Sequence, residues 1–339
     1  MTRAMTVAAS AAPKANGART GRPLLLVGRK VVSGVVTVLG VTIAVHLLFS
    51  LVPGGPAYAI LGADATPETV AAVNEKYGFD DPIHTRYLDW MGGLLSGDFG
   101  VSHRTQRPVL DMVAAALPVT LELAVLTVVL ALLVSVVLAT VCVQRPGKLI
   151  DRTVTGLSSA ALSVPTFLIG LALVYVFGVV LGVLPIIGWV PLTESPLDNL
   201  RYLVLPVSML AAHEIAEYTR VLRGDLLTTL SEDYITVARS LGLPTTAIML
   251  RYALRPSSLT VITLAGLNFG RLLGGAVIAE AIFLLPGIGS VIVQGISSRD
   301  LPLLQGAIVF VAIVFIVVNL LADVLQSIVD PRSRPVAKP

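Results

Sequence analysis

Long apolar runs recur along the whole 339-residue chain, and they constrain its fold more than any other feature. A helix needs roughly 20 apolar residues to cross a bilayer, and six runs meet that need. They lie at 29–52, 118–143, 154–183, 200–222, 259–285 and 303–329. Charged residues make up only 13% of the chain, against about a quarter in soluble domains. The sequence therefore predicts an all-α polytopic membrane protein with six transmembrane helices.

The third run is the least regular of the six. Glycine and proline recur between 178 and 191, although no charged residue occurs between Arg152 and Glu194. Because glycine and proline interrupt helices, we interpret this part as one helix over 154–183 followed by an apolar, turn-rich loop. A second short span here would place the Arg-rich loop 223–258 outside the cytoplasm, against the charge distribution.

Lysine and arginine gather on one side of the predicted topology. With six spans, the tails 1–28 and 330–339 share a side with the loops 144–153 and 223–258, and these segments hold most of the basic residues. The positive-inside rule assigns that side to the cytoplasm. We therefore predict that both termini are cytoplasmic, that 1–28 is a disordered tail, and that 53–117 is extracytoplasmic.

The segment 53–117 is too long to be a simple connector. The sequence TPE at 66–68 is typical of a helix start and Gly78 of a helix end. DP at 81–82 and RP at 107–108 indicate two further helix starts. The segment is thus an extracytoplasmic helical insertion, which either only connects two spans or docks an external partner. The candidates for such docking are its acidic residues Asp80, Asp81 and Asp89.

Residues 232–256 read EDYITVARSLGLPTTAIMLRYALRP and predict two short amphipathic helices. Ser231 can cap the first helix, and Gly242 stands where a left-handed residue often ends one. Thr245 can cap the second helix, which Pro256 ends or kinks before the fifth span. The apolar residues at helical spacing in the first helix share one face: Tyr234, Val237, Ala238 and Leu241.

Two functions fit this pair of helices. An interfacial helix would lie on the inner leaflet with its apolar face in lipid. A protruding helical knob would instead insert into a groove on a soluble partner. Two helices joined by a glycine suit a projection better than one long flat helix would.

The knob sequence is also where a family resemblance becomes specific. EDYITVARSLGL (232–243) with LRYALRP (250–256) resembles the cytoplasmic coupling loop of ABC-importer permeases, in particular the oligopeptide/dipeptide (peptide/nickel) permease family. The general pattern of that loop is Glu-Ala-Ala, three residues, then Gly, and this chain keeps its second Ala and its Gly as Ala238 and Gly242. Further similar stretches follow in order: PGGP (53–56), DDPIHTRYLDWMGGLLSGDFGVS (80–102), TRVLRGDLL (219–227), GGAVIAEAIFLLPGIG (274–289) and DPR (330–332).

The resemblance implies a place in a larger assembly in a bacterial cytoplasmic membrane. One such permease pairs with a second, homologous permease above two cytoplasmic ATPase subunits, and an external substrate-binding protein delivers the peptide. Relatives in the family carry short peptides, nickel chelates, glutathione or sugars. The ATPase-coupling residues it implies here are Glu232, Asp233, Tyr234, Val237, Ala238, Arg239, Leu241 and Gly242.

The chain lacks an ATP site of its own. None of its lysines is followed by Ser or Thr, so it contains no P-loop. ATP and magnesium are therefore expected on the partner ATPases, and the chain itself is expected to be a transport subunit without cofactor, metal or catalytic residue.

Charged groups at membrane depth are costly, and they usually face a pathway or another helix. The candidates are His46, Glu214, Arg271 and Glu280. Arg271 and Glu280 stand about 13–14 Å apart along one predicted helix and cannot pair directly. We expect each to meet another helix or the partner permease, and we rank such pairing ahead of substrate contact.

Two alternative functions use the same residues. HEIAE (213–217) approaches the His-Glu-x-x-His zinc motif, although Glu217 replaces the second histidine, which leaves an intramembrane metalloprotease as one alternative. A proton-coupled secondary transporter could use Glu214, Glu217 or Glu280 as proton carriers, but such proteins often show internal repeats, and none is convincing here.

Overall fold

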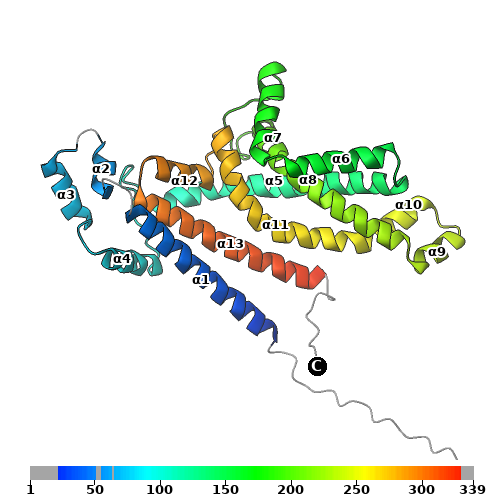
Figure 1. Ribbon diagram of the computed structural model, residues 1–339, viewed down its shortest axis with the longest axis horizontal. Coiled ribbons are helices and arrows are strands. Elements are labelled where there is room, and N and C mark those ends of the chain that lie inside the picture. Colours follow the sequence, from blue (N-terminus) through cyan, green and yellow to red (C-terminus); the bar gives the residue numbers. More distant parts are fainter. Residues whose placement is uncertain (1–21, 51–54, 63–64, 330–339) are drawn as a thin grey trace, which may run out of the picture.

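The computed structural model describes residues 22–50, 55–62 and 65–329, and these are almost entirely helical (Figure 1). In chain order the helices are α1 (Arg22–Ser50), α2 (Gly55–Leu61), α3 (Pro67–Tyr77), α4 (Ile83–Leu95), α5 (Val109–Gln144), α6 (Leu149–Ser163), α7 (Thr166–Leu173), the π-helix η2 (Val174–Val180), α8 (Pro196–Leu230), α9 (Asp233–Ser240), α10 (Thr245–Ala247), the π-helix η3 (Ile248–Ala253), α11 (Leu254–Phe283), α12 (Ile288–Ser297) and α13 (Leu301–Val329). The predicted tail 330–339 and most of the predicted tail 1–28 lie outside the described residues.

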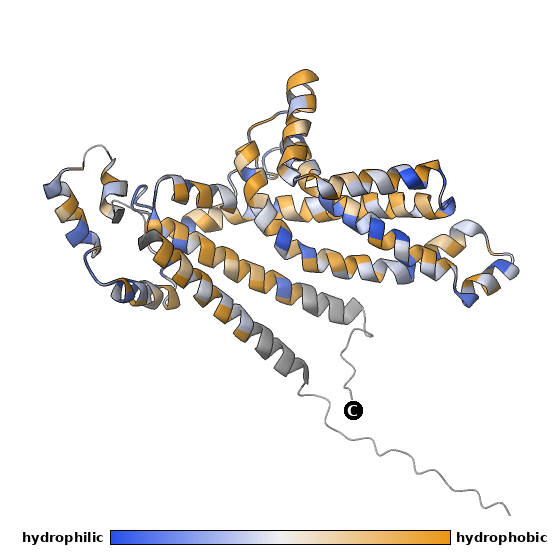
Figure 2. Cartoon of the chain, in the orientation of Figure 1, coloured by the Kyte–Doolittle hydropathy of each residue, from blue (hydrophilic) through white to orange (hydrophobic). Residues whose placement is uncertain are grey.

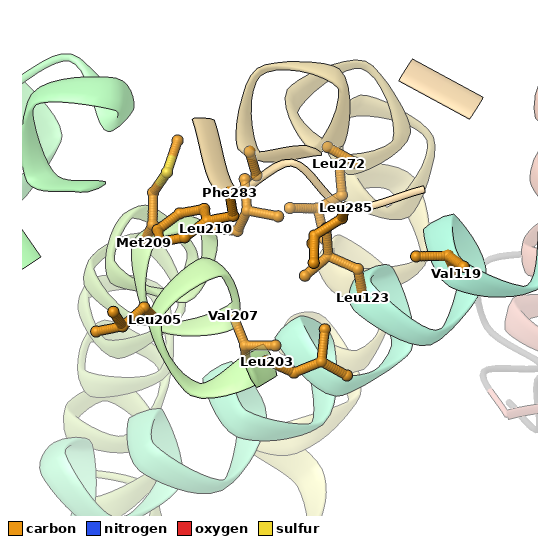
Figure 3. Packing of buried hydrophobic residues seen from close by; sticks show 12 residues of the cluster. Val119, Leu123, Leu203, Leu205, Val207, Met209, Leu210, Leu272, Phe283 and Leu285 are labelled. Atoms are coloured by element: carbon orange, nitrogen blue, oxygen red, sulfur yellow. The ribbon is translucent and has the colours of Figure 1, made fainter. Parts of the chain in front are cut away.

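Three long helices, α5, α8 and α11, pack against one another and form the centre of the molecule. Figure 3 shows their shared core, in which Leu123 of α5, Met209 of α8 and Phe283 of α11 are each almost fully buried. α13 packs on α11, and α1 packs on α13. In Figure 1, α2–α4 lie at one end of this bundle, and α9 and α10 lie at the opposite end.

Several helices suit a membrane by length and composition. Among the described residues, α5, the continuous helix Thr245–Phe283 and Leu301–Leu321 of α13 are long and apolar enough to cross it, and the bent pair α6 with α7–η2 makes a fourth. The described apolar part of α1, Val32–Leu48, is shorter. α8 is long, but it carries several charged residues. A polytopic helical membrane fold is therefore confirmed, whereas the count of six spans remains a prediction.

The third predicted span is not a single helix over 154–183. α6 ends at Ser163, and α7 begins at Thr166 with its axis turned by 107°. The cause is Pro165, because a proline disfavours helical geometry at the preceding residue. Val164 accordingly has extended angles of φ −93° and ψ 130°.

Other predicted boundaries shift because hydropathy does not mark where a helix begins or ends. α5 begins at Val109, at the helix start indicated by RP at 107–108, and runs without a break into the predicted span 118–143. α8 continues past the predicted 222 to Leu230, with Leu226 fully buried. Pro256 lies inside the continuous helix Thr245–Phe283, directly after the π-helix η3, and ends no helix. Its missing amide leaves the Tyr252 carbonyl free, and that carbonyl accepts from the Tyr234 hydroxyl.

Local signals in the 53–117 segment are confirmed. Thr66 caps α3, and its hydroxyl accepts a hydrogen bond from the Thr69 amide. Gly78 ends α3 with a left-handed φ of 62°. α4 follows Pro82, and α5 follows Pro108.

Candidate functional site

The first candidate site is the helical knob, residues 232–253, which follows α8 directly. The Ser231 hydroxyl donates to the Thr228 carbonyl at 2.6 Å, so it closes the end of α8 and does not cap α9 as predicted. Glu232 stands at the N-cap of α9 without a side-chain cap bond. Pro244, and not Thr245, precedes α10. The second short helix, α10 with η3, then runs into α11 without a break.

Gly242 makes the reversal between the two short helices possible. Its φ is +75°, in the left-handed region expected from the sequence. The Gly242 amide donates to the Arg239 carbonyl at 3.0 Å, and the Leu243 amide donates to the Ala238 carbonyl at 3.3 Å. These two bonds form the Schellman arrangement, which satisfies the last carbonyls of α9.

The two faces of α9 differ from the prediction at one residue. Ala238 is buried with Ile235 and Ile248 in a small core that holds the knob together, so it does not share the outer apolar face. Tyr234, Val237 and Leu241 are 45%, 57% and 75% exposed and form that outer face.

The other residues predicted to couple are also on the surface of α9. Glu232, Asp233 and Arg239 are exposed, as is Gly242. The Tyr234 hydroxyl donates to the Tyr252 carbonyl at 3.2 Å and thereby ties α9 to η3. The knob is thus an internally packed unit that presents apolar side chains away from the rest of the chain.

A clamp that the sequence did not reveal lies beside the knob end of α8. Arg223 donates from Nε and Nη2 to the two carboxylate oxygens of Asp151, at 2.5 and 2.7 Å. Asp151 is buried at the start of α6, and it also accepts from the Gly147 amide at 2.8 Å. The only sequence signal was that Asp151 is an acid among basic residues, and this signal did not identify Arg223 as its partner.

The second candidate site is a polar network between α8 and α11, made by Glu214, Glu217, Asn268 and Arg271. Arg271 Nη2 lies 3.0 Å from Glu214 Oε1 and 2.8 Å from Glu217 Oε2. The Asn268 amide donates to Glu214 Oε2 at 3.2 Å and to Glu217 Oε2 at 3.0 Å. Figure 2 shows the hydrophilic patches on both helices within mostly apolar surroundings. Glu214 of α8 and Arg271 of α11 thus pair with each other across the two helices.

Glu280 of α11 also meets other elements, but it lies in a separate place. Its carboxylate is fully buried, accepts from Thr120 of α5 at 2.6 Å, and accepts from the Gly289 amide at 2.6 Å. The Thr120 hydroxyl in turn accepts from the Ile288 amide at 2.9 Å. Glu280 therefore satisfies free amides at the start of α12, where a helix terminus favours negative charge. This is a structural role.

His46 of α1 is buried as well. Its Nδ1 lies 2.7 Å from Nε2 of Gln305 on α13, and its ring meets the edge of the Tyr87 ring at 5.5 Å between centroids. His46 therefore joins α1, α4 and α13, and it does not contact the polar network.

Asp300 is a second buried anchor that sequence reasoning missed. It accepts from the Ser102 hydroxyl at 2.6 Å and from the amides of His103 and Arg104 at 3.3 Å each. It thereby ties the 53–117 segment to the start of α13. Burial lowers the pKa of the His103 imidazole. The charge of Asp300 raises this pKa, and the charge of Lys76 lowers it. The sequence DLP at 300–302 is a helix-start signal that could have indicated Asp300.

The three acidic docking candidates are exposed. Asp80 accepts from the Asn74 amide at 2.9 Å, Asp81 lies in the turn after Gly78, and Asp89 lies on α4. Across the described ranges, no group of three or more His, Cys, Asp or Glu side chains is placed to hold a metal ion. His213 of the HEIAE sequence therefore belongs to no such group.

Comparison with known proteins yields matches over nearly the whole chain. The family described as "Binding-protein-dependent transport system inner membrane component" matches residues 131–335. The family for the N-terminal part of such membrane components matches residues 24–124.

Individual relatives are similar over nearly their full lengths. A Brucella abortus (strain 2308) protein whose name describes a peptide transport system permease is 37% identical over 309 residues, which cover 91% of this chain and 98% of that protein. The oligopeptide transport system permease protein AppB of Bacillus subtilis (strain 168) is 36% identical over 307 residues, covering 90% of this chain and 97% of AppB.

A chain in an inward-facing structure of the MetNI methionine ABC transporter shares the fold. Its TM-score is 0.50 at 19% identity, and the match covers 66% of this chain and 96% of that chain.

Proposed function

Because the chain belongs to the family of binding-protein-dependent transport system inner membrane components, it is a multi-pass permease subunit of an ABC importer, and we propose that it carries short peptides. The substrate class is supported by the relatives named for peptide and oligopeptide transport. The family membership favours this function over the secondary transporter and the intramembrane metalloprotease.

The single observation that carries the coupling assignment is the outer face of the helical knob. Tyr234, Val237 and Leu241 leave apolar surface exposed on a unit whose own core is closed by other residues. Exposed apolar side chains on a short helix are suited to a groove in a protein partner. The partner proposed for this face is the cytoplasmic ATPase subunit, and the ATP and magnesium are proposed to bind to that subunit.

Substitution of Val237 tests this assignment against the interfacial-helix alternative. Val237→Asp should prevent co-purification of the ATPase subunits and abolish peptide uptake, because the groove would receive a charge without a partner. Thr236→Asp is the matched control, since Thr236 is exposed on the polar flank of the same helix. If the Val237→Asp permease retains its ATPases and transports normally, the coupling assignment is wrong.

The 53–117 segment is proposed to dock the external binding protein. Its exposed acids are Asp89 on α4 and Asp80 and Asp81 between α3 and α4. α3 and α4 lie at the end of the bundle opposite α9 (Figure 1). Replacing all three with Lys should weaken stimulation of ATP hydrolysis by the loaded binding protein, most strongly at low salt. Glu194→Lys, in the exposed loop before α8, is the control. Equal stimulation of the wild type and the triple variant at low salt would show that these acids do not dock the binding protein and that the segment only connects two spans.

The proposed topology has six spans and cytoplasmic termini. The opposite positions of α4 and the knob support placing them on opposite sides of the membrane (Figure 1). Cysteines introduced at Ser96 and at Ser231, both exposed, should differ in labelling by an impermeant thiol reagent added to intact cells. Equal labelling at the two positions would overturn this orientation.

A further inference from the structure

Arg271 stands on the outer surface of a helix that is apolar enough to span the membrane. Its side chain is 52% exposed, and Leu267, Gly274 and Ile278 share its exposed stripe at helical spacing. A guanidinium that faces acyl chains at this depth is costly. The stripe therefore faces water or another protein, and the polar network behind it opens onto the same surface.

The network carries more negative than positive charge. Glu214 and Glu217 are both paired with a single nitrogen, Nη2 of Arg271, so two carboxylates share one guanidinium. Glu217 receives both of its described hydrogen bonds at Oε2, which leaves Oε1 without one. Arg220, one turn further along α8, forms none of the described ion pairs. A cation that arrived at the exposed edge of Glu217 would find a carboxylate oxygen still open.

Tyr218 closes the inner side of the network. It is fully buried, and its hydroxyl lies beside Glu214 and Asn268. The open acceptor of the network, Oε1 of Glu217, is therefore on the exposed side.

We propose that the polar network of Glu214, Glu217, Asn268 and Arg271 lines the translocation pathway and receives the N-terminal ammonium group of the passing peptide. This inference rests on the proposed function and specifies the part of the substrate that is recognised. A free amino terminus is common to short peptides of any sequence, so one acidic position would serve them all. Glu217 makes the contact, and Arg271 and Asn268 hold its carboxylate in place.

The test measures the local charge with thiol reagents and needs no peptide. Gly274→Cys provides the reporter, because no atom lies within 4 Å of the added Cβ. It is introduced with Cys142→Ala into the assembled complex of both permeases and the ATPases, from which all other cysteines have been removed. The rates of reaction with a cationic and an anionic methanethiosulfonate are then compared, with and without ATP.

Each rate is divided by the rate of the same reagent with a free thiol in solution. After this correction, the cationic reagent should react faster than the anionic one. Glu217→Gln should lower the cationic-to-anionic rate ratio several-fold, since removal of a nearby negative charge slows the cationic reagent and speeds the anionic one. Arg271→Gln should shift the ratio in the opposite direction. Glu122→Gln, which removes an equal charge from α5, should leave it unchanged.

The substrate itself supplies the second measurement. A tripeptide with a free amino terminus should slow labelling of the cysteine at position 274, whereas the N-acetylated tripeptide at the same concentration should not, and Glu217→Gln should abolish the difference. A ratio that favours the anionic reagent would assign the site to the peptide carboxylate and overturn the proposal. So would a reporter that is unreactive in both nucleotide states, or a ratio that Glu217→Gln leaves unchanged. Absence of peptide uptake by the wild-type complex would instead refute the proposed function, whatever the charge ratio.

Discussion

Replacement of Gly242 with Val isolates the backbone requirement of the helical knob. Gly242 has a φ of +75°, and no atom lies within 4 Å of the position that a Cβ would take. Steric contact with neighbours therefore adds nothing at the Cβ, and the cost is that of a branched residue in the left-handed region, about 1–2 kcal/mol. That penalty lowers the ratio of native to non-native turn by a factor of roughly 5–30.

The expected result is a weaker ATPase complex on an intact membrane domain. The dissociation constant of the purified ATPase subunits for the permease in nanodiscs should rise, by at most about the same factor of 5–30, and peptide uptake should fall with it. Gly224→Val is the matched control, because Gly224 lies inside α8 with equally open space around it but without a positive φ. Gly242→Asn should recover much of the affinity, since Asn tolerates the left-handed region better than Val.

Two outcomes would refute this reasoning. Wild-type affinity and uptake in the Gly242→Val permease would show that the turn does not set the ATPase contact. Equal loss in Gly242→Asn and Gly242→Val would show that side-chain bulk at this position matters and that backbone conformation does not.

Three further predictions concern stability. Ala238→Asp places a carboxyl group in the closed core of the knob, so it should destabilise the knob by roughly 2–7 kcal/mol and make 232–253 sensitive to proteolysis even without ATPases. Gly289→Ala overlaps the backbone of Val277, so it should lower stability in detergent by about 1–3 kcal/mol, whereas Gly274→Ala, with open space, should not change it. Because burial lowers the pKa of His103, the unfolded chain binds that proton more readily, and stability should fall as the pH drops below about 6.5; thermal unfolding from pH 5 to 8 should show this fall, and His103→Gln should reduce it.

Sequence reasoning succeeded for several features that depend on a local interaction, although the predicted caps at Ser231 and Thr245 were wrong. The TPE signal and Gly78 delimit α3, and the positive φ of Gly242 follows from its place after a short helix. Each depends on atoms within a few residues of itself. Hydropathy was a poorer guide to helix ends, because it reports which residues prefer lipid. α8 continues past its apolar part, since Leu226 still finds a buried place against neighbouring helices.

The candidate site was predicted in composition but not in its contacts. Charged residues within apolar runs identified Glu214, Arg271 and Glu280, because such residues need a partner at membrane depth. The partners themselves are distant in sequence: Arg271 and Glu214 are 57 residues apart, and Ser102 and Asp300 are 198 apart. No local pattern specifies such a pair without an alignment or a fold. Ala238 was misplaced for a related reason, since helical spacing alone does not say which side of a short helix the rest of the chain covers.

The polar network and the knob are joined by one unbroken helix. From Glu217 to Leu230, α8 extends about 20 Å at 1.5 Å per residue, and the only proline inside α8, Pro206, lies on the far side of the network. Leu230 packs against the knob core, so a displacement of the knob acts directly on the end of this segment. α11 follows η3 directly and carries Arg271, which pairs with Glu214 of α8. A change of angle between α8 and α11 at the knob would therefore alter the distance from Arg271 to Glu217, so movement of the knob would change how strongly Arg271 neutralises the Glu217 carboxylate.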